Sequence, residues 1–209
     1  MSQPLILTAD SASLEQAVEI VRTGGVIAYP TETLYGLGGL ATQRRVVERV
    51  LAIKGRGPAD PLPLIVADEE AAAEAAHLPS AALELAEIFW PGPLTFILRA
   101  RVDFPPGVIL AGKIALRVSF HPLAQTLTQR LNAPLIATSA NQTGQPGATT
   151  AEEVFLALAA DPPDLILDGG PSPGGPASTI LDMTQTPPLL VREGAIALSE
   201  LKEFLSGWA

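Results

Sequence analysis

Short apolar segments alternate with helical patterns along the chain, and this alternation limits the possible folds more than any other feature. Strands are expected at residues 26–29, 64–66, 94–98, 114–118, 135–137, 165–167, 179–181 and 189–191. Ser13, with Gln16 three residues on, is expected to open the first helix, and Gly24-Gly25 to close it. Further helices are expected at residues 43–53, 68–77, 80–89, 122–131, 150–159 and 198–206. Such alternation predicts a layered α/β domain, and consecutive strands without intervening helices predict a mixed sheet.

The composition fits one globular domain. The chain has 209 residues, of which 47% are apolar, and we expect residues 1–209 to form a single domain. The Pro/Gly-rich stretch 169–176 is interpreted as a loop, because strand patterns resume directly after it. No stretch approaches the roughly 20 apolar residues of a spanning helix, and residues 1–4 include no basic region leading into an apolar run. The sequence therefore favours a cytoplasmic protein without membrane association.

Cysteine, histidine and net charge exclude several kinds of chemistry. The sequence contains no cysteine and only two histidines, His77 and His121. Disulfides, thiolate catalysis and cysteine–zinc sites are therefore ruled out, and no protein metal centre is expected. The net charge of −9 disfavours a protein that coats nucleic acid without sequence preference.

Cations at the ends of expected elements are the best candidates for contact with an anion. Lys54 and Arg56 flank a glycine at a helix C-terminus. Together they could grip phosphate oxygens, and an ordinary helix cap is the alternative. Arg117 ends an apolar strand and needs an anionic partner, either a carboxylate of the protein or an acidic group of a ligand. Arg192 follows the last strand, where it is either a further cation for the same ligand or part of a surface salt bridge.

Two polar segments, residues 29–38 and 137–144, each follow an expected strand. The first offers threonine and tyrosine hydroxyls in a turn between a strand and a helix, where α/β sheets commonly place ligands. The second offers hydroxyl, amide and backbone N–H groups that could meet an anion. A plain capped turn is the alternative for each. Gly36-x-Gly38-x-x-Ala41 partly matches the dinucleotide-binding fingerprint, but we reject the match because it begins six residues beyond the strand.

Seven segments in this order resemble the YrdC/TsaC family of threonylcarbamoyl-AMP synthases. They are YPTETLYGLG, KGR followed by PLIV, WPGPLTFIL, KIALRVSFHP, PLIATSANQTG, STILD and LLVREGAI, and they extend from about residue 24 to 196. The resemblance implies an α/β fold with a twisted mixed sheet, flanking helices and a deep basic cavity. It also implies a nucleotidyltransferase that joins L-threonine, bicarbonate and ATP, with Mg²⁺ accompanying the nucleotide. The product would serve the t6A modification of tRNA, with tRNA or a tRNA-modifying transferase complex as further partners.

The resemblance also implies roles for individual residues. Catalytic roles fall to Lys54, Arg56 and Arg117. ATP-binding roles fall to Lys54, Arg56, Asp60, Ser139, Asn141 and Arg192. L-threonine-binding roles fall to Thr31, Thr33, Tyr35, Arg117, Ala137 and Thr179, and no residue is implied to bind a metal.

The sequence departs from the family pattern at five positions: Gly57, Asp60, Ala67, Gly147 and Ala177. Asp60 adds a negative charge near the expected phosphates, and Ala67 stands where many relatives have a histidine near threonine. These departures leave open a YciO-type paralogue with weaker or different chemistry. A non-catalytic protein of the same fold that binds RNA or a nucleotide is the alternative from another functional class.

Overall fold

The computed structural model describes residues 4–205 and confirms the mixed α/β class. The strands form two mixed sheets, whereas the sequence suggested one. The first sheet has the order β1 (Leu5–Thr8), β10 (Leu165–Asp168), β2 (Ile27–Pro30), β3 (Tyr35–Gly38), β9 (Thr138–Ser139). The second has the order β12 (Leu189–Arg192), β11 (Thr179–Asp182), β6 (Leu94–Ala100), β7 (Lys113–Val118), β4 (Leu64–Val66), β8 (Leu135–Ile136), and β5 (Ala76–His77) pairs with β6.

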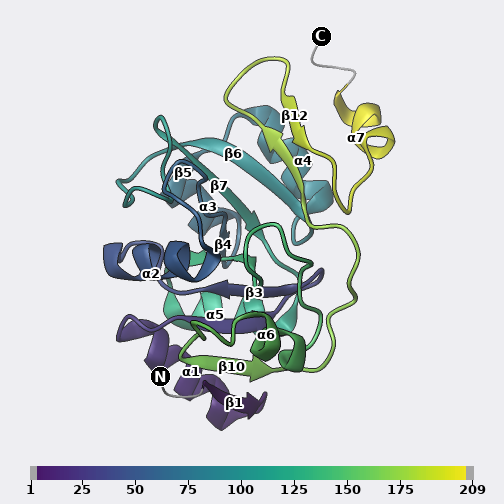
Figure 1. Ribbon diagram of the computed structural model, residues 1–209. Helices are drawn as coiled ribbons and strands as arrows, with labels where there is room; N and C mark the ends of the chain where they lie inside the picture. Colours follow the sequence, from purple (N-terminus) through teal and green to yellow (C-terminus); the bar gives the residue numbers. More distant parts are fainter. Residues whose placement is uncertain (1–3, 206–209) are drawn as a thin grey trace.

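Helices flank both sheets. They are α1 (Ser11–Arg22), α2 (Arg44–Lys54), α3 (Glu69–Ala75), α4 (Ser80–Phe89), α5 (Pro122–Leu131), α6 (Ala151–Ala157) and α7 (Leu198–Leu205). Figure 1 shows β6, β7 and β12 with α3, α4 and α7 in the upper part of the molecule, and β1, β3 and β10 with α1, α5 and α6 in the lower part. None of the helices within residues 4–205 is both long and apolar enough to cross a membrane.

The start of α1 corrects the sequence-based expectation. The helix is capped by Asp10, whose side chain accepts a hydrogen bond from the Ser13 backbone at 2.8 Å. The Ser13 hydroxyl in turn accepts from the Asp10 backbone N–H at 2.8 Å, so Ser13 is the third residue of a reciprocal capping box rather than its first. The apolar face expected for α2 is confirmed, because Val46, Val47 and Val50 are fully buried.

The segment after Tyr29 is a β-hairpin rather than a turn into a helix. Strands β2 and β3 pair antiparallel, with Tyr29 opposite Gly36, and only then does the chain reach α2. Strand β3 escaped the sequence analysis because its glycines weaken the strand signal. The hairpin places its loop, residues 31–34 with the polar Thr31, Glu32 and Thr33, at the end of the first sheet.

The two sheets meet where the chain passes from β8 to β9. These strands are separated only by Ala137, yet β8 pairs with β4 of the second sheet and β9 with β3 of the first. Gly38 of β3 makes this contact possible, because a Cβ added there would lie 1.8 Å from the Ile136 carbonyl oxygen. The sequence analysis treated residues 135–137 as one strand. The change of sheet places Ala137 and Ser139 at the junction.

Candidate functional site

A cavity of about 470 Å³ is lined by residues of both sheets. This volume lies in the range of small-molecule binding sites. Nearly all of the candidate residues line it: Thr31, Thr33, Tyr35, Lys54, Arg56, Asp60, Arg117, Ala137, Ser139, Asn141 and Arg192. The structure thus brings together four cations that are up to 138 positions apart in sequence (192 − 54). Thr179 is the one candidate residue that is not part of the lining.

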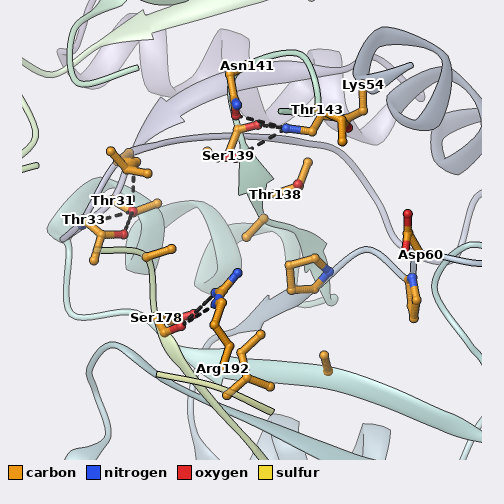
Figure 2. A pocket seen from close by; sticks show the side chains of 18 of the residues that line it. Thr31, Thr33, Lys54, Asp60, Thr138, Ser139, Asn141, Thr143, Ser178 and Arg192 are labelled. Atoms are coloured by element: carbon orange, nitrogen blue, oxygen red, sulfur yellow. Dashed lines mark hydrogen bonds between the residues drawn. The ribbon is translucent and has the colours of Figure 1, made fainter. Parts of the chain in front are cut away.

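Lys54 lies at the end of α2, where Gly55 in the left-handed conformation, with φ 65°, ends the helix. Its Nζ donates to the Ser139 carbonyl at 2.6 Å and to Asn141 Oδ1 at 3.1 Å (Figure 2). Burial, with a smaller contribution from nearby Arg56, lowers the pKa of Lys54 to about 8. The ammonium therefore has neutral partners only, and an anion in the cavity would stabilise its charge.

Arg56 is the next cation along the chain, and part of its guanidinium lacks a partner. One nitrogen, Nη2, donates weakly to the Pro61 carbonyl at 3.4 Å, whereas Nε is buried without any hydrogen bond. Burial lowers the pKa of Arg56, and the nearby carboxylate of Asp60 opposes this shift. Buried donors are nearly always paired, so the unpaired Nε is an unusual feature of this arginine, which also lines the cavity.

Arg117 has a protein carboxylate as partner and also lines the cavity. Its Nη1 donates to Oε1 of Glu32, a residue of the β2–β3 hairpin. The other carboxylate oxygen of Glu32 accepts from the hydroxyl of Ser119. The sequence analysis left open whether Arg117 pairs with the protein or with a ligand. The structure shows the first, and the position in the cavity wall keeps the second available.

Arg192, at the end of β12, reaches into the cavity from the side opposite Lys54 (Figure 2). Its Nη2 and Nε donate to the Ser178 carbonyl at 2.7 and 3.2 Å. Burial lowers the pKa of Arg192, and the positive charge of Arg117 lowers it further. Within residues 4–205, Arg192 forms no salt bridge, and its guanidinium is held by the Ser178 carbonyl rather than by the surface carboxylate considered from the sequence.

The hydroxyl groups of the candidate residues differ in how far hydrogen bonds within the protein already occupy them. Tyr35 donates to the Gly170 carbonyl at 2.8 Å, which ties β3 to the 169–176 loop. Thr179 Oγ1 donates to the Ile196 carbonyl at 2.7 Å and accepts from the Gly194 and Ile196 N–H groups at 2.9 and 3.0 Å. Thr179 is fully buried, so its hydroxyl holds the segment after β12 in place. Thr31 and Thr33, with their oxygens 3.4 Å apart, line the cavity.

Several lining residues were given no individual role from the sequence. Thr138, Thr143 and Ser178 add polar groups, and Ile97, Ile180 and Val191 add an apolar wall from the second sheet. Glu32, behind Arg117, was also missed, although an acid beside Thr31 and Thr33 was a candidate partner for a buried arginine. Ala67 lines a separate hollow of about 160 Å³ rather than this cavity.

The cavity suits an anionic ligand and has few ligands for a metal ion. Asp60 is the one carboxylate among its lining residues. Within residues 4–205, no group of three or more His, Asp or Glu side chains is arranged to hold a metal. A divalent cation would therefore take most of its ligands from water or from a bound anion.

Fold and cavity define a class of α/β proteins in which two mixed sheets enclose a cation-rich hollow. A model of the Sua5/yciO/yrdC family, described as telomere recombination, matches residues 19–194. The match covers most of the chain, and the chain therefore belongs to the Sua5/yciO/yrdC family.

Individual relatives support this assignment over most of the chain. The threonylcarbamoyl-AMP synthase of Pyrococcus abyssi is 37% identical over 192 residues, which make up 90% of this chain and 56% of the relative. The structure of P. abyssi Sua5 complexed with L-threonine has a TM-score of 0.89 at 32% identity, covering 97% of this chain and 61% of that one. The structure of E. coli YciO has a TM-score of 0.84 at 31% identity and is covered to 99%. The chain thus spans only a little over half of the P. abyssi protein.

Proposed function

We propose that the protein is an L-threonylcarbamoyl-AMP synthase, which forms threonylcarbamoyl-AMP and pyrophosphate from L-threonine, bicarbonate and ATP. The observation that carries the proposal is the convergence of Lys54, Arg56, Arg117 and Arg192 on one cavity with too few carboxylates to balance them. The names of the curated relatives and the threonine-bound P. abyssi structure support the choice of substrates.

The reaction needs the cations because its participants are anionic. The threonine amine attacks bicarbonate with loss of water, or CO₂ with loss of a proton, to give a carbamate. A carbamate oxygen then attacks the α-phosphorus of ATP and displaces pyrophosphate. Repulsion between carbamate and triphosphate opposes this attack, and a fixed set of positive groups lining the cavity offsets it. Holding the reactants together in one cavity provides a further part of the acceleration.

We divide the cavity into two proposed regions according to the residue roles that the family resemblance implies. Lys54, Arg56, Asp60, Ser139, Asn141 and Arg192 form the ATP region, with Mg²⁺ arriving on the phosphates and neutralising part of their charge. Thr31, Thr33, Arg117 and the backbone of Ala137 form the threonine region. The Ala137 N–H already donates to the Pro63 carbonyl at 2.8 Å, so its own carbonyl is the group left for a substrate. Tyr35 and Thr179 support these regions through their bonds to backbone.

The proposed product is a mixed anhydride of a carbamate and AMP, which reacts with water. We therefore expect a tRNA-modifying transferase to take it up in the cytoplasm, where it would complete the t6A modification. A non-catalytic RNA- or nucleotide-binding role is not favoured, because curated relatives that match most of this chain are named as synthases.

The proposal is tested by pyrophosphate release. Mg-ATP and bicarbonate should yield pyrophosphate only when L-threonine is added, and the adenylate should be detectable by mass spectrometry. Arg56→Met should reduce the rate by about 100-fold or more, since it removes a donor aimed at the phosphates. Arg44→Met is the matched control, because Arg44 is an exposed arginine of α2 paired only with Glu48. A well-folded wild-type protein that releases no threonine-dependent pyrophosphate would contradict the proposal.

A further inference from the structure

We propose that Glu32 is a positioning residue, which fixes one edge of the Arg117 guanidinium so that the other edge is presented to the carboxylate of the amino-acid substrate. This inference rests on the proposed function, because it concerns the amino-acid region of the same cavity. It gives a role to Glu32, the acidic residue between Thr31 and Thr33.

The burial of Glu32 is the first argument. Its side chain is 0% exposed, although an isolated carboxylate is strongly destabilised away from water. Both oxygens are used: one accepts from Arg117 and the other from the Ser119 hydroxyl. A buried carboxylate with both oxygens bound has a fixed orientation and can orient its partner.

The strand that carries the two donors is the second argument. Arg117 belongs to β7, and Ser119 directly follows that strand. Residues two apart on extended backbone point to the same side, so a single carboxylate from the hairpin can bridge them. The Ser119 hydroxyl also accepts from the His121 N–H at 3.2 Å, next to the start of α5. The hairpin, β7 and the start of α5 therefore fix the carboxylate together.

The remaining N–H groups of Arg117 are the third argument. The Arg117 side chain forms one hydrogen bond within residues 4–205, the bond from Nη1 to Glu32, and it lines the cavity. A guanidinium has five N–H donors in a rigid planar fork, so one partner leaves an edge for a bidentate carboxylate. The cavity supplies the space for that second carboxylate.

Comparison with Arg192 shows how Glu32 changes the charge balance of Arg117. Arg192 is near enough for its pKa to be lowered by Arg117, but it is held by a backbone carbonyl and not by a carboxylate. Glu32 balances the charge of Arg117 and leaves that of Arg192 unbalanced. Arg117 is therefore suited to bind the carboxylate of a zwitterionic amino acid through a bidentate contact. Arg192 is suited to bind a polyanion through its charge.

The test compares three variants: Glu32→Ala, Glu32→Gln and Ser119→Ala. Glu32→Ala should raise the KM for threonine about tenfold or more, because a hydrogen bond that orients a charged group is lost. Its KM for ATP should stay within about twofold. Glu32→Gln should bring the threonine KM back to within about threefold of wild type, because the amide can accept from Arg117 and donate to Ser119. Ser119→Ala should raise the threonine KM about threefold, because it frees one carboxylate oxygen.

Asp182→Ala is the matched control for damage to a partly buried ion pair. Asp182 is 8% exposed and pairs with Lys113 at 2.8 Å, and neither residue lines the cavity. This variant should lose thermal stability and keep the wild-type KM for threonine. Threonine binding by calorimetry, in the presence of a non-hydrolysable ATP analogue, should repeat the order of the KM values.

The outcomes separate this inference from the proposed function. If wild type releases threonine-dependent pyrophosphate but folded Glu32→Ala keeps its threonine KM, the positioning role is wrong and the function stands. A Glu32→Gln variant that is as impaired as Glu32→Ala also contradicts the positioning role. The negative charge of Glu32, and not the hydrogen bonds that orient Arg117, would then account for the effect on the threonine KM. If Glu32→Ala does not fold, Ser119→Ala decides, and an unchanged threonine KM overturns the proposal. A wild type without activity contradicts the function, and calorimetry with threonine still tests Glu32.

Discussion

Lys54 carries a charge that depends on pH within the ordinary assay range. Its pKa is lowered to about 8, first by burial and then by Arg56, so the ammonium is charged below that pH and loses its proton above it. Affinity for a non-hydrolysable ATP analogue should therefore fall between pH 7 and 9, by up to about tenfold per pH unit once the pH exceeds the pKa. Binding near pH 8 should also take up a proton, because the phosphates favour the charged form.

Calorimetry in two buffers with different heats of protonation measures both effects. Lys54→Arg is the comparison variant, because a guanidinium stays charged throughout this range. It should bind the analogue with little pH dependence and no proton uptake. The same pH dependence in wild type and in Lys54→Arg would show that another group titrates.

At this scale the cations were predictable from the sequence and the hydroxyls were not. A buried arginine in an apolar strand needs an anionic partner, so Arg117 could be recognised as a candidate. Lys54 could be recognised because it and Arg56 flank a glycine at a helix C-terminus. A threonine or tyrosine hydroxyl is satisfied equally well by a backbone carbonyl. Thr179 and Tyr35 bind backbone in this way, and only the three-dimensional structure shows it.

Strand β3 is the element on which the site depends most. Within the first sheet β3 pairs with β9, and it also lies against β8 of the second sheet. It therefore sets the position of the β2–β3 hairpin and of the residues after Ala137. Its close approach requires glycine at position 38. Local propensity could not predict this strand, because the requirement comes from a segment about 100 residues further along the chain.

Gly38→Ala should therefore destabilise the whole protein. The added Cβ would meet the backbone of Ile136, which cannot turn aside as a side chain can. Overpacking of this kind lowers the free energy of unfolding by about 1–3 kcal/mol, which for a chain of this size corresponds to a fall in Tm of roughly 2–12 °C. Gly57→Ala is the control, because a Cβ there meets nothing within 4 Å, and its Tm should match wild type in calorimetric melting. Equal melting of both variants would rule out a tight contact at position 38.

On the scale of the whole molecule, the sequence predicted the α/β class but not the division into two sheets. Alternation of helices and strands is a local pattern, whereas the change of sheet at Ala137 depends on pairing between distant segments. The division matters because the cavity takes its walls from both sheets. It gathers positive charge in a chain whose net charge is −9. The cations that line the cavity therefore repel one another, as Arg56 does Lys54 and Arg117 does Arg192.

An anion that fills the cavity should relieve this repulsion and stabilise the folded protein. Pyrophosphate at about 100 times its Kd would add about 2.7 kcal/mol, or roughly 5–11 °C in Tm for a chain of this size. Sodium chloride at equal ionic strength should give a much smaller shift, because screening acts on all charges and does not fill the site. Arg192→Met should lose much of the pyrophosphate effect while Arg44→Met keeps it, as measured by differential scanning calorimetry. Equal shifts from both salts would mean that the four cations act as separate surface charges rather than as one site.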